Sequence, residues 1–106
     1  MPTYQVFHAK EPNFGNLSFR PDPRWPEDYN LVATVEAQNP EHVFLLTQNG
    51  YSYWPENDDA QAVPTTTGYR STSVGDIVVG SEGTLRVDAI GWSYLSPDGK
   101  FIPTDL

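Results

Sequence analysis

The sequence predicts an α+β fold: a small antiparallel β-sheet, one principal short helix and long proline-rich loops. The chain has 106 residues, the length of one domain, so residues 1–106 are treated as a single domain. Its 10 prolines and 8 glycines favour short strands joined by loops over a helical bundle. Apolar residues alternate in several short runs, whereas the clearest helical signal is one short segment.

Two strands separated by a long loop are expected in the N-terminal part. Residues 4–9 form the first strand, and residues 29–37 form the second, with Leu31, Ala33 and Val35 on one face. Prolines and glycine exclude regular structure between Glu11 and Glu27. Four apolar side chains are expected to attach this loop to the core: Phe14, Leu17, Phe19 and Trp25.

A short helix is expected over residues 40–48. Asn39 suits the N-cap, Pro40 suits the first helical position, and Glu41 interacts favourably with the positive end of the helix dipole. The apolar run 43–46 should supply the buried stripe, with Leu45 or Leu46 facing the sheet, and Asn49-Gly50 should end the helix.

The C-terminal third is expected to be an antiparallel meander that follows a polar loop over residues 55–67. The expected elements are a strand at 77–79, a turn at 80–83, a strand at 84–90 with Leu85, Val87 and Ala89 inward, a bend at Gly91-Trp92, a turn at 96–99 and a strand at 101–102.

The charge of the chain is strongly negative and unevenly distributed. The net charge is −8, and the segment 22–59 holds eight acidic residues and one basic residue, a net charge of −7. An acidic field repels phosphate, so direct nucleic-acid binding is not expected. The acidic residues serve solubility, or they form a surface for a basic protein partner. The candidate partner surface consists of Glu27, Asp28, Glu56, Asp58 and Asp59.

Several function classes are excluded or disfavoured by residue usage. The chain has no cysteine, which excludes disulfides, thiolate catalysis and cysteine-ligated zinc. The N-terminus shows no signal-peptide pattern, and no apolar run approaches the ~20 residues of a membrane helix. We expect a cytoplasmic protein that needs no membrane, metal or cofactor.

Candidate catalytic groups are few. His8 and His42 are the only histidines, and His42 is expected to cap the helix or face solvent. The acidic loop 56–59 lacks the ligand spacing of a calcium loop. The hydroxyl run 71–73 could hold a nucleophile, but it has no Gly-x-Ser-x-Gly elbow and no histidine nearby in the sequence. Asp76 and Asp88 could face each other as acid and base from neighbouring strands.

Aromatic residues could form a stacking platform for bases or sugars, although in a small sheet such residues more often belong to the core and its rim. With six basic residues, the chain also lacks the positive groove that single-stranded nucleic acid needs. The candidates are Trp25, Tyr51, Tyr53, Trp54, Trp92 and Tyr94.

Four motifs stand out within residues 40–95: Phe-Leu-Leu-Thr-Gln-Asn at 44–49, Trp54 with Asn57, Arg-Ser-Thr-Ser-Val-Gly-Asp at 70–76, and Gly91-Trp92. Together they resemble a pattern in YodL-like domains, which are small proteins and domains of phages, plasmids and conjugative elements. The resemblance implies an accessory or host-interaction role and carries over no catalytic residues. We call residues 70–76 the box.

The matching box residues are Arg70, Ser71, Ser73, Gly75 and Asp76. Gly75 permits a tight turn, Asp76 can accept backbone N–H groups, and Arg70 can clamp Asp76 or a carbonyl. We therefore interpret the box as a strand-entry turn with an internal hydrogen-bond network, and only secondarily as a ligand site.

Three functions remain open from the sequence. The leading hypothesis is a non-enzymatic accessory protein of a phage or other mobile element, which binds a basic host or element-encoded protein. The second is a small hydrolase or nucleotide-handling enzyme with Arg70 and Asp76 in its site. The third is an aromatic-platform binder of nucleic acid or carbohydrate.

Overall fold

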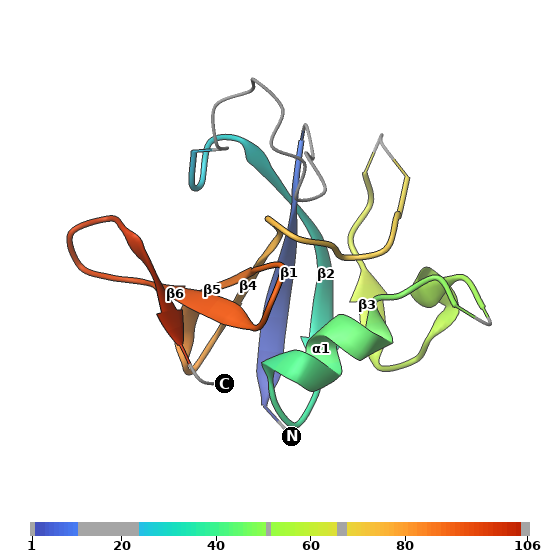
Figure 1. Ribbon diagram of the computed structural model, residues 1–106. Coiled ribbons are helices and arrows are strands. Elements are labelled where there is room, and N and C mark those ends of the chain that lie inside the picture. The colour runs from blue at the N-terminus through green and yellow to red at the C-terminus, as the bar shows by residue number, and fades with distance from the viewer. Residues whose placement is uncertain (1, 11–23, 51, 66–67, 105–106) are drawn as a thin grey trace.

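The computed structural model describes residues 2–10, 24–50, 52–65 and 68–104. Within these residues the fold is mixed α+β and dominated by one antiparallel sheet of seven strands, with one short α-helix (Figure 1). The elements in chain order are β1 (Thr3–Ala9), β2 (Tyr29–Glu36), α1 (Pro40–Leu46), a 3₁₀ turn η1 (Trp54–Glu56), β3 (Ala60–Ala62), β4 (Ile77–Gly80), β5 (Gly83–Val87), β6 (Trp92–Leu95) and β7 (Phe101–Thr104).

The strand order across the sheet is β3-β2-β1-β4-β5-β6-β7. The N-terminal strand β1 therefore lies inside the sheet, between β2 and β4. After β2 the chain forms α1 and η1 and adds β3 at the outer edge of β2, and it then crosses to the other side of β1 to form the meander β4–β7. The crossing segment 68–76 contains the box and runs past the end of β1 (Figure 1).

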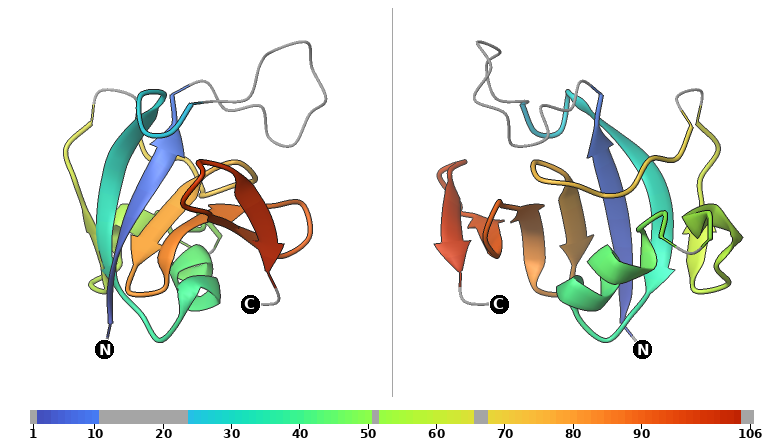
Figure 2. Two further views of the ribbon diagram at one scale, coloured as in Figure 1. Left: turned by 90° about the vertical axis from the view of Figure 1, so that its left-hand side faces the viewer. Right: turned by 45° about the vertical axis from the view of Figure 1, so that its right-hand side comes forward.

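The core has two parts, one on each face of the sheet. The larger cluster lies on the face that α1 covers, and it includes Tyr4, Val43, Trp54, Leu85 and Trp92, all buried. Figure 2 shows α1 against this face of the twisted sheet. The smaller cluster, on the opposite face, is Ala9, Tyr29 and Ile77 with partly buried aromatic side chains around it.

Helix α1 begins as the sequence predicts and ends earlier. The Asn39 side chain accepts a hydrogen bond from the His42 backbone N–H (2.9 Å), and the His42 ring accepts one from the Gln38 N–H (3.1 Å). The helix ends at Leu46 instead of residue 48 because Thr47 already has non-helical dihedral angles. Its Oγ1 bonds back to the Val43 carbonyl (3.0 Å).

The structure shows which side of α1 faces the sheet, a choice that the sequence leaves open between Leu45 and Leu46. Val43 is fully buried, Phe44 and Leu46 are partly buried, and the Leu45 side chain is 62% exposed. Leu46 thus packs on the core as expected, whereas Leu45 points to solvent. Four consecutive apolar residues cover all directions around a helix, so their sequence does not select the inward side chain.

Four other features of the fold differ from the expectations. The predicted loop over 55–67 contains η1 and the edge strand β3, and a strand not expected, β6, follows the bend at Gly91. β5 ends at Val87, so Ala89 is exposed beyond the strand. A register shift in the β1–β2 ladder leaves Val32 unpaired beside Val6 and Phe7, so the alternation of Leu31 with Ala33 and Val35 is interrupted.

Most of the proline-rich segment, including Phe14, Leu17 and Phe19, lies outside the described residues. Trp25, which is described, attaches its segment to the sheet as expected. Its ring contacts Phe7 and Tyr29 edge-on, with centroid distances of 4.9 Å and 5.4 Å.

Candidate functional site

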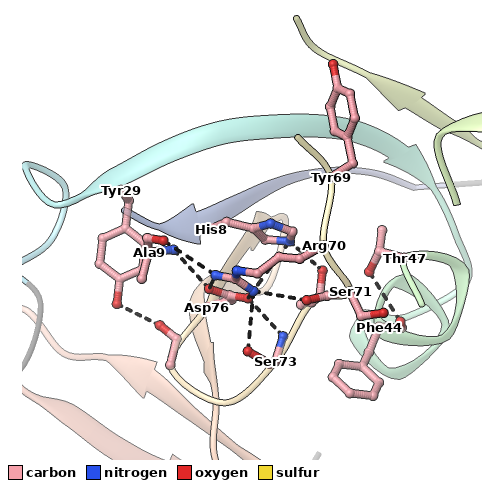
Figure 3. A network of polar contacts seen from close by, with 12 residues as sticks. His8, Ala9, Tyr29, Phe44, Thr47, Tyr69, Arg70, Ser71, Ser73 and Asp76 are labelled. Carbon is pink, nitrogen blue, oxygen red and sulfur yellow. Dashed lines mark hydrogen bonds and ion pairs between the residues drawn. The ribbon is translucent and has the colours of Figure 1, made fainter. Parts of the chain in front are cut away.

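The box is organised around the carboxylate of Asp76, which is fully buried. Two of its hydrogen bonds come from Arg70: Nη1 lies 2.6 Å from Oδ2, and Nη2 lies 2.8 Å from Oδ1 (Figure 3). Two come from backbone N–H groups, Ala9 to Oδ1 (2.9 Å) and Ser73 to Oδ2 (2.8 Å). Each oxygen therefore accepts two hydrogen bonds, which compensate for its loss of water.

The Arg70 guanidinium also makes several hydrogen bonds within the protein. Besides Asp76 it contacts the carbonyls of Ser71 (3.0 Å) and Ala9 (3.4 Å) and the Ser73 hydroxyl (3.3 Å). Its side chain is 26% exposed. The sequence predicts that Arg70 binds Asp76 or a backbone carbonyl, and the structure confirms both contacts. The two parallel hydrogen bonds to the carboxylate also fix the orientation of the guanidinium plane.

His8 was not expected beside the box. Its Nε2 lies 2.9 Å from Thr72 Oγ1 and 3.8 Å from Asp76 Oδ2, and the ring is buried. Burial lowers the pKa of His8 to about 4; nearby Arg70 lowers it further, and Asp76 opposes the shift. His8 is thus neutral at pH 7. Because 64 residues separate it from Thr72, only the tertiary fold reveals this neighbour.

The His8–Thr72 pair does not have the geometry of an activated nucleophile. In a catalytic triad the carboxylate binds one ring nitrogen and the nucleophile binds the other. Here Thr72 and Asp76 both lie at Nε2 of His8. The Thr72 side chain is also buried at 1% exposure, so a substrate has no direct approach to the hydroxyl.

Residues after helix α1 hold the first half of the box in place. The Thr47 carbonyl accepts from the Thr72 N–H (3.0 Å), and Gln48 Nε2 donates to the Thr72 carbonyl (2.8 Å). The Asn49 N–H donates to Ser71 Oγ (2.7 Å), and its side-chain amide donates to the Tyr69 carbonyl (2.9 Å). The motif 44–49 thus fixes the course of the box.

Trp54 and Tyr29 fix the box at two further points. Trp54, in η1, donates from Nε1 to the Arg70 carbonyl (2.8 Å), and its backbone N–H donates to the Asn49 side chain (2.9 Å). The Tyr29 hydroxyl donates to the Gly75 carbonyl (2.7 Å). The motif residues Thr47, Gln48, Asn49 and Trp54 therefore all bind the box.

The turn before β4 has the form that the sequence predicts. Gly75 has φ +96, a conformation that residues with a Cβ rarely adopt. Its N–H donates to the Val87 carbonyl (2.8 Å), and the Asp76 N–H donates to the Ser73 carbonyl (3.0 Å). The chain then enters β4 at Ile77.

The candidate acidic surface is divided into two groups. Glu27 and Asp28 precede β2, with Glu27 exposed and Asp28 half-buried. The other group, which we call the η1–β3 acids, consists of the exposed residues Glu56, Asp58 and Asp59. It lies beside the far end of β2, where Asp59 O accepts from the Glu36 N–H (3.1 Å). A strand of eight residues separates the two groups by ~25 Å.

Asp76 and Asp88 do not form an acid–base pair. Asp88 binds Arg86 Nε (2.9 Å) and the Ser93 hydroxyl, whereas Asp76 binds Arg70. The Arg86 guanidinium also lies over the Phe101 ring, 4.6 Å from its centroid. Within the described part of the chain, no three histidine or acidic side chains are grouped to hold a metal ion.

The aromatic residues considered for a stacking platform are dispersed. Trp54 and Trp92 are buried in the larger core cluster, and Trp25 packs on the opposite face. Tyr53 and Tyr94 are exposed, at 45% and 40%, and lie on different elements. Tyr51 is outside the described residues. A sheet of this size uses its large aromatic side chains to fill the core.

Comparisons of the chain with protein-family models, curated proteins and solved structures found no match. The YodL-like resemblance therefore stays a prediction. Among the described residues, no helix has the length and apolar character needed to cross a membrane.

Proposed function

We propose that the protein is a non-enzymatic accessory factor that acts by binding a basic protein through its exposed acidic side chains. The role in phages, plasmids or other mobile elements that the box resemblance implies is part of this proposal, as is a cytoplasmic place of action. The proposal rests on how the polar groups of the chain are divided between the interior and the surface.

The supporting observation is that the groups best suited to chemistry, in the box and beside it, form hydrogen bonds within the protein. Asp76 is fully buried with four donors, Arg70 makes two bonds to it, and His8 is buried against Thr72. In the described residues, no buried side-chain nitrogen or oxygen is left without a hydrogen-bond partner. Such a network stabilises a fold and has no free group to offer a substrate.

By contrast, the η1–β3 acids project from the surface, as does Glu27. Exposed carboxylates of one sign raise the encounter rate with a basic protein and help to orient it. The same field disfavours nucleic acid, which agrees with the net charge of −8.

Affinity capture tests this proposal. The immobilised protein is incubated with a bacterial lysate at several salt concentrations around 0.15 M, where the Debye length is about 8 Å. Bound proteins are identified by mass spectrometry and then purified, and their dissociation constants are measured. We expect basic partners whose affinity falls as salt rises.

Two matched variants locate the surface. One neutralises the η1–β3 acids (Glu56→Gln, Asp58→Asn, Asp59→Asn), and the other neutralises Glu27→Gln with Asp28→Asn. Loss of binding in either variant, with an unchanged melting temperature, supports the proposal. Partners without a basic surface, or partners that bind both variants as they bind wild type, would contradict it.

A further inference from the structure

An aromatic row extends from the buried box to the surface. Tyr53 contacts Tyr69 edge-on (centroids 6.2 Å apart, 70° between planes), and Tyr69 contacts Trp54 in the same way (5.4 Å, 83°). The inner two rings are anchored, because Trp54 Nε1 donates to the Arg70 carbonyl and the Tyr69 hydroxyl donates to the Val63 carbonyl, both at 2.8 Å.

Tyr53 is the exposed end of this row, with 45% of its surface accessible. Its carbonyl accepts from the Glu56 N–H (3.0 Å), so Tyr53 and Glu56 lie in one turn, and Asp58 and Asp59 follow directly along the chain. A tyrosine ring attracts a cation through its negative face, and carboxylates beside it strengthen that attraction.

We propose that Tyr53 is the central contact of the partner interface, and that its ring binds a lysine or arginine side chain of a basic protein while the η1–β3 acids surround that cation. The inference rests on the proposed function and narrows it to the η1–β3 end of β2. The Tyr53 ring packs edge-on against the anchored Tyr69 ring. Tyrosine has few rotatable bonds, so it loses little conformational freedom on binding, a property of residues that dominate interface affinity.

The test uses a fluorescein-labelled oligo-arginine peptide as the probe, with dissociation constants from anisotropy at about 0.15 M salt. Tyr53→Leu removes the ring and should weaken binding about two- to fivefold, whereas Tyr53→Phe keeps the ring and should bind like wild type. Tyr94→Leu is the matched control: it removes a tyrosine of similar exposure, 40%, from β6 and should leave binding unchanged.

The outcomes separate this inference from the proposed function. If wild type does not bind the peptide, the basic-partner proposal and the inference both fail. If wild type binds and Tyr53→Leu binds equally well, or Tyr94→Leu loses as much, the inference alone fails. Should Tyr53→Leu unfold, NMR of wild type decides: the peptide must shift the ring resonances of Tyr53 more than those of Tyr94.

Discussion

At the scale of single residues, the box shows how polar residues of the kind found in active sites can instead stabilise a fold. A buried carboxylate is costly unless its oxygens are hydrogen-bonded and its charge is paired. Asp76 meets both conditions through Arg70 and two backbone donors. The sequence predicts the Arg70–Asp76 contact, because the pair is six residues apart. It does not predict Ala9 or His8, which come from the other end of the chain.

Tyr4 and Gly80 give a test of close packing between β1 and β4. A Cβ on Gly80 would lie 2.4 Å from Tyr4 Cδ1, and the ring is fixed by burial and by its hydroxyl bond to Glu82 Oε2 (2.6 Å). Gly80→Ala should therefore reduce the free energy of unfolding by about 1–3 kcal/mol in urea denaturation.

Gly50→Ala is the control for that substitution, because a Cβ at Gly50 meets no atom within 4 Å. It should unfold at nearly the wild-type urea concentration. Equal midpoints for the two alanine variants would show that Tyr4 does not pack over Gly80 as described.

At the scale of elements, the sequence is most informative where local signals are strong. The Asn39-Pro40 start of α1, the positive φ of Gly75, and the turn at 96–99, where Gly99 also has positive φ, all follow from residue type. β3 could not be predicted, because Ala-Gln-Ala has no strand preference of its own. It forms because the edge of β2 offers backbone partners at residues 33–35.

The phase of α1 leads to a paired prediction. Val43→Ala should cost about 2 kcal/mol of unfolding free energy, because it removes buried methyl groups and leaves a cavity. Leu45→Ala removes a larger side chain that is 62% exposed and should cost less than about 0.5 kcal/mol. Thermal or urea unfolding of both variants measures the difference, and a reversed order would mean that α1 packs on another face.

At the scale of the whole molecule, the edge strand β7 is protected against pairing with another chain. The Ser96 N–H donates to the Lys100 carbonyl (2.8 Å), so these two residues form a hydrogen-bonded pair. From that pair onward, hydrogen-bonded and non-hydrogen-bonded pairs alternate along the β6–β7 ladder. Pro103 lies opposite Ser93 in a non-hydrogen-bonded pair, so its backbone nitrogen and carbonyl point away from β6. The missing N–H of proline removes one donor from that outer edge and so weakens its pairing with another strand.

Acid stability should depend on His8. In the unfolded chain its pKa is near 6.5, and in the folded protein it is about 4. Between these values the unfolded state binds the extra proton, so the free energy of unfolding falls as pH falls from 6.5 to 4. A pKa difference of this size corresponds to about 3 kcal/mol at the acidic end of that range.

Urea unfolding of wild type and His8→Gln at several pH values checks this expectation. His8→Gln should show a shallower loss of stability than wild type between pH 6.5 and pH 4. Identical pH profiles for wild type and His8→Gln would mean that His8 is not buried in its neutral form.

The buried Asp76 carboxylate is the structural group that organises the box, and the unfolding free energy of Asp76→Ala tests this role most directly. Removing the carboxylate leaves Arg70 and two backbone N–H groups without their acceptor, so we predict a loss of about 3 kcal/mol in urea denaturation. Circular dichroism confirms that the variant is folded before the titration. A free energy within about 0.5 kcal/mol of wild type would contradict the structural role and favour a ligand site at the box.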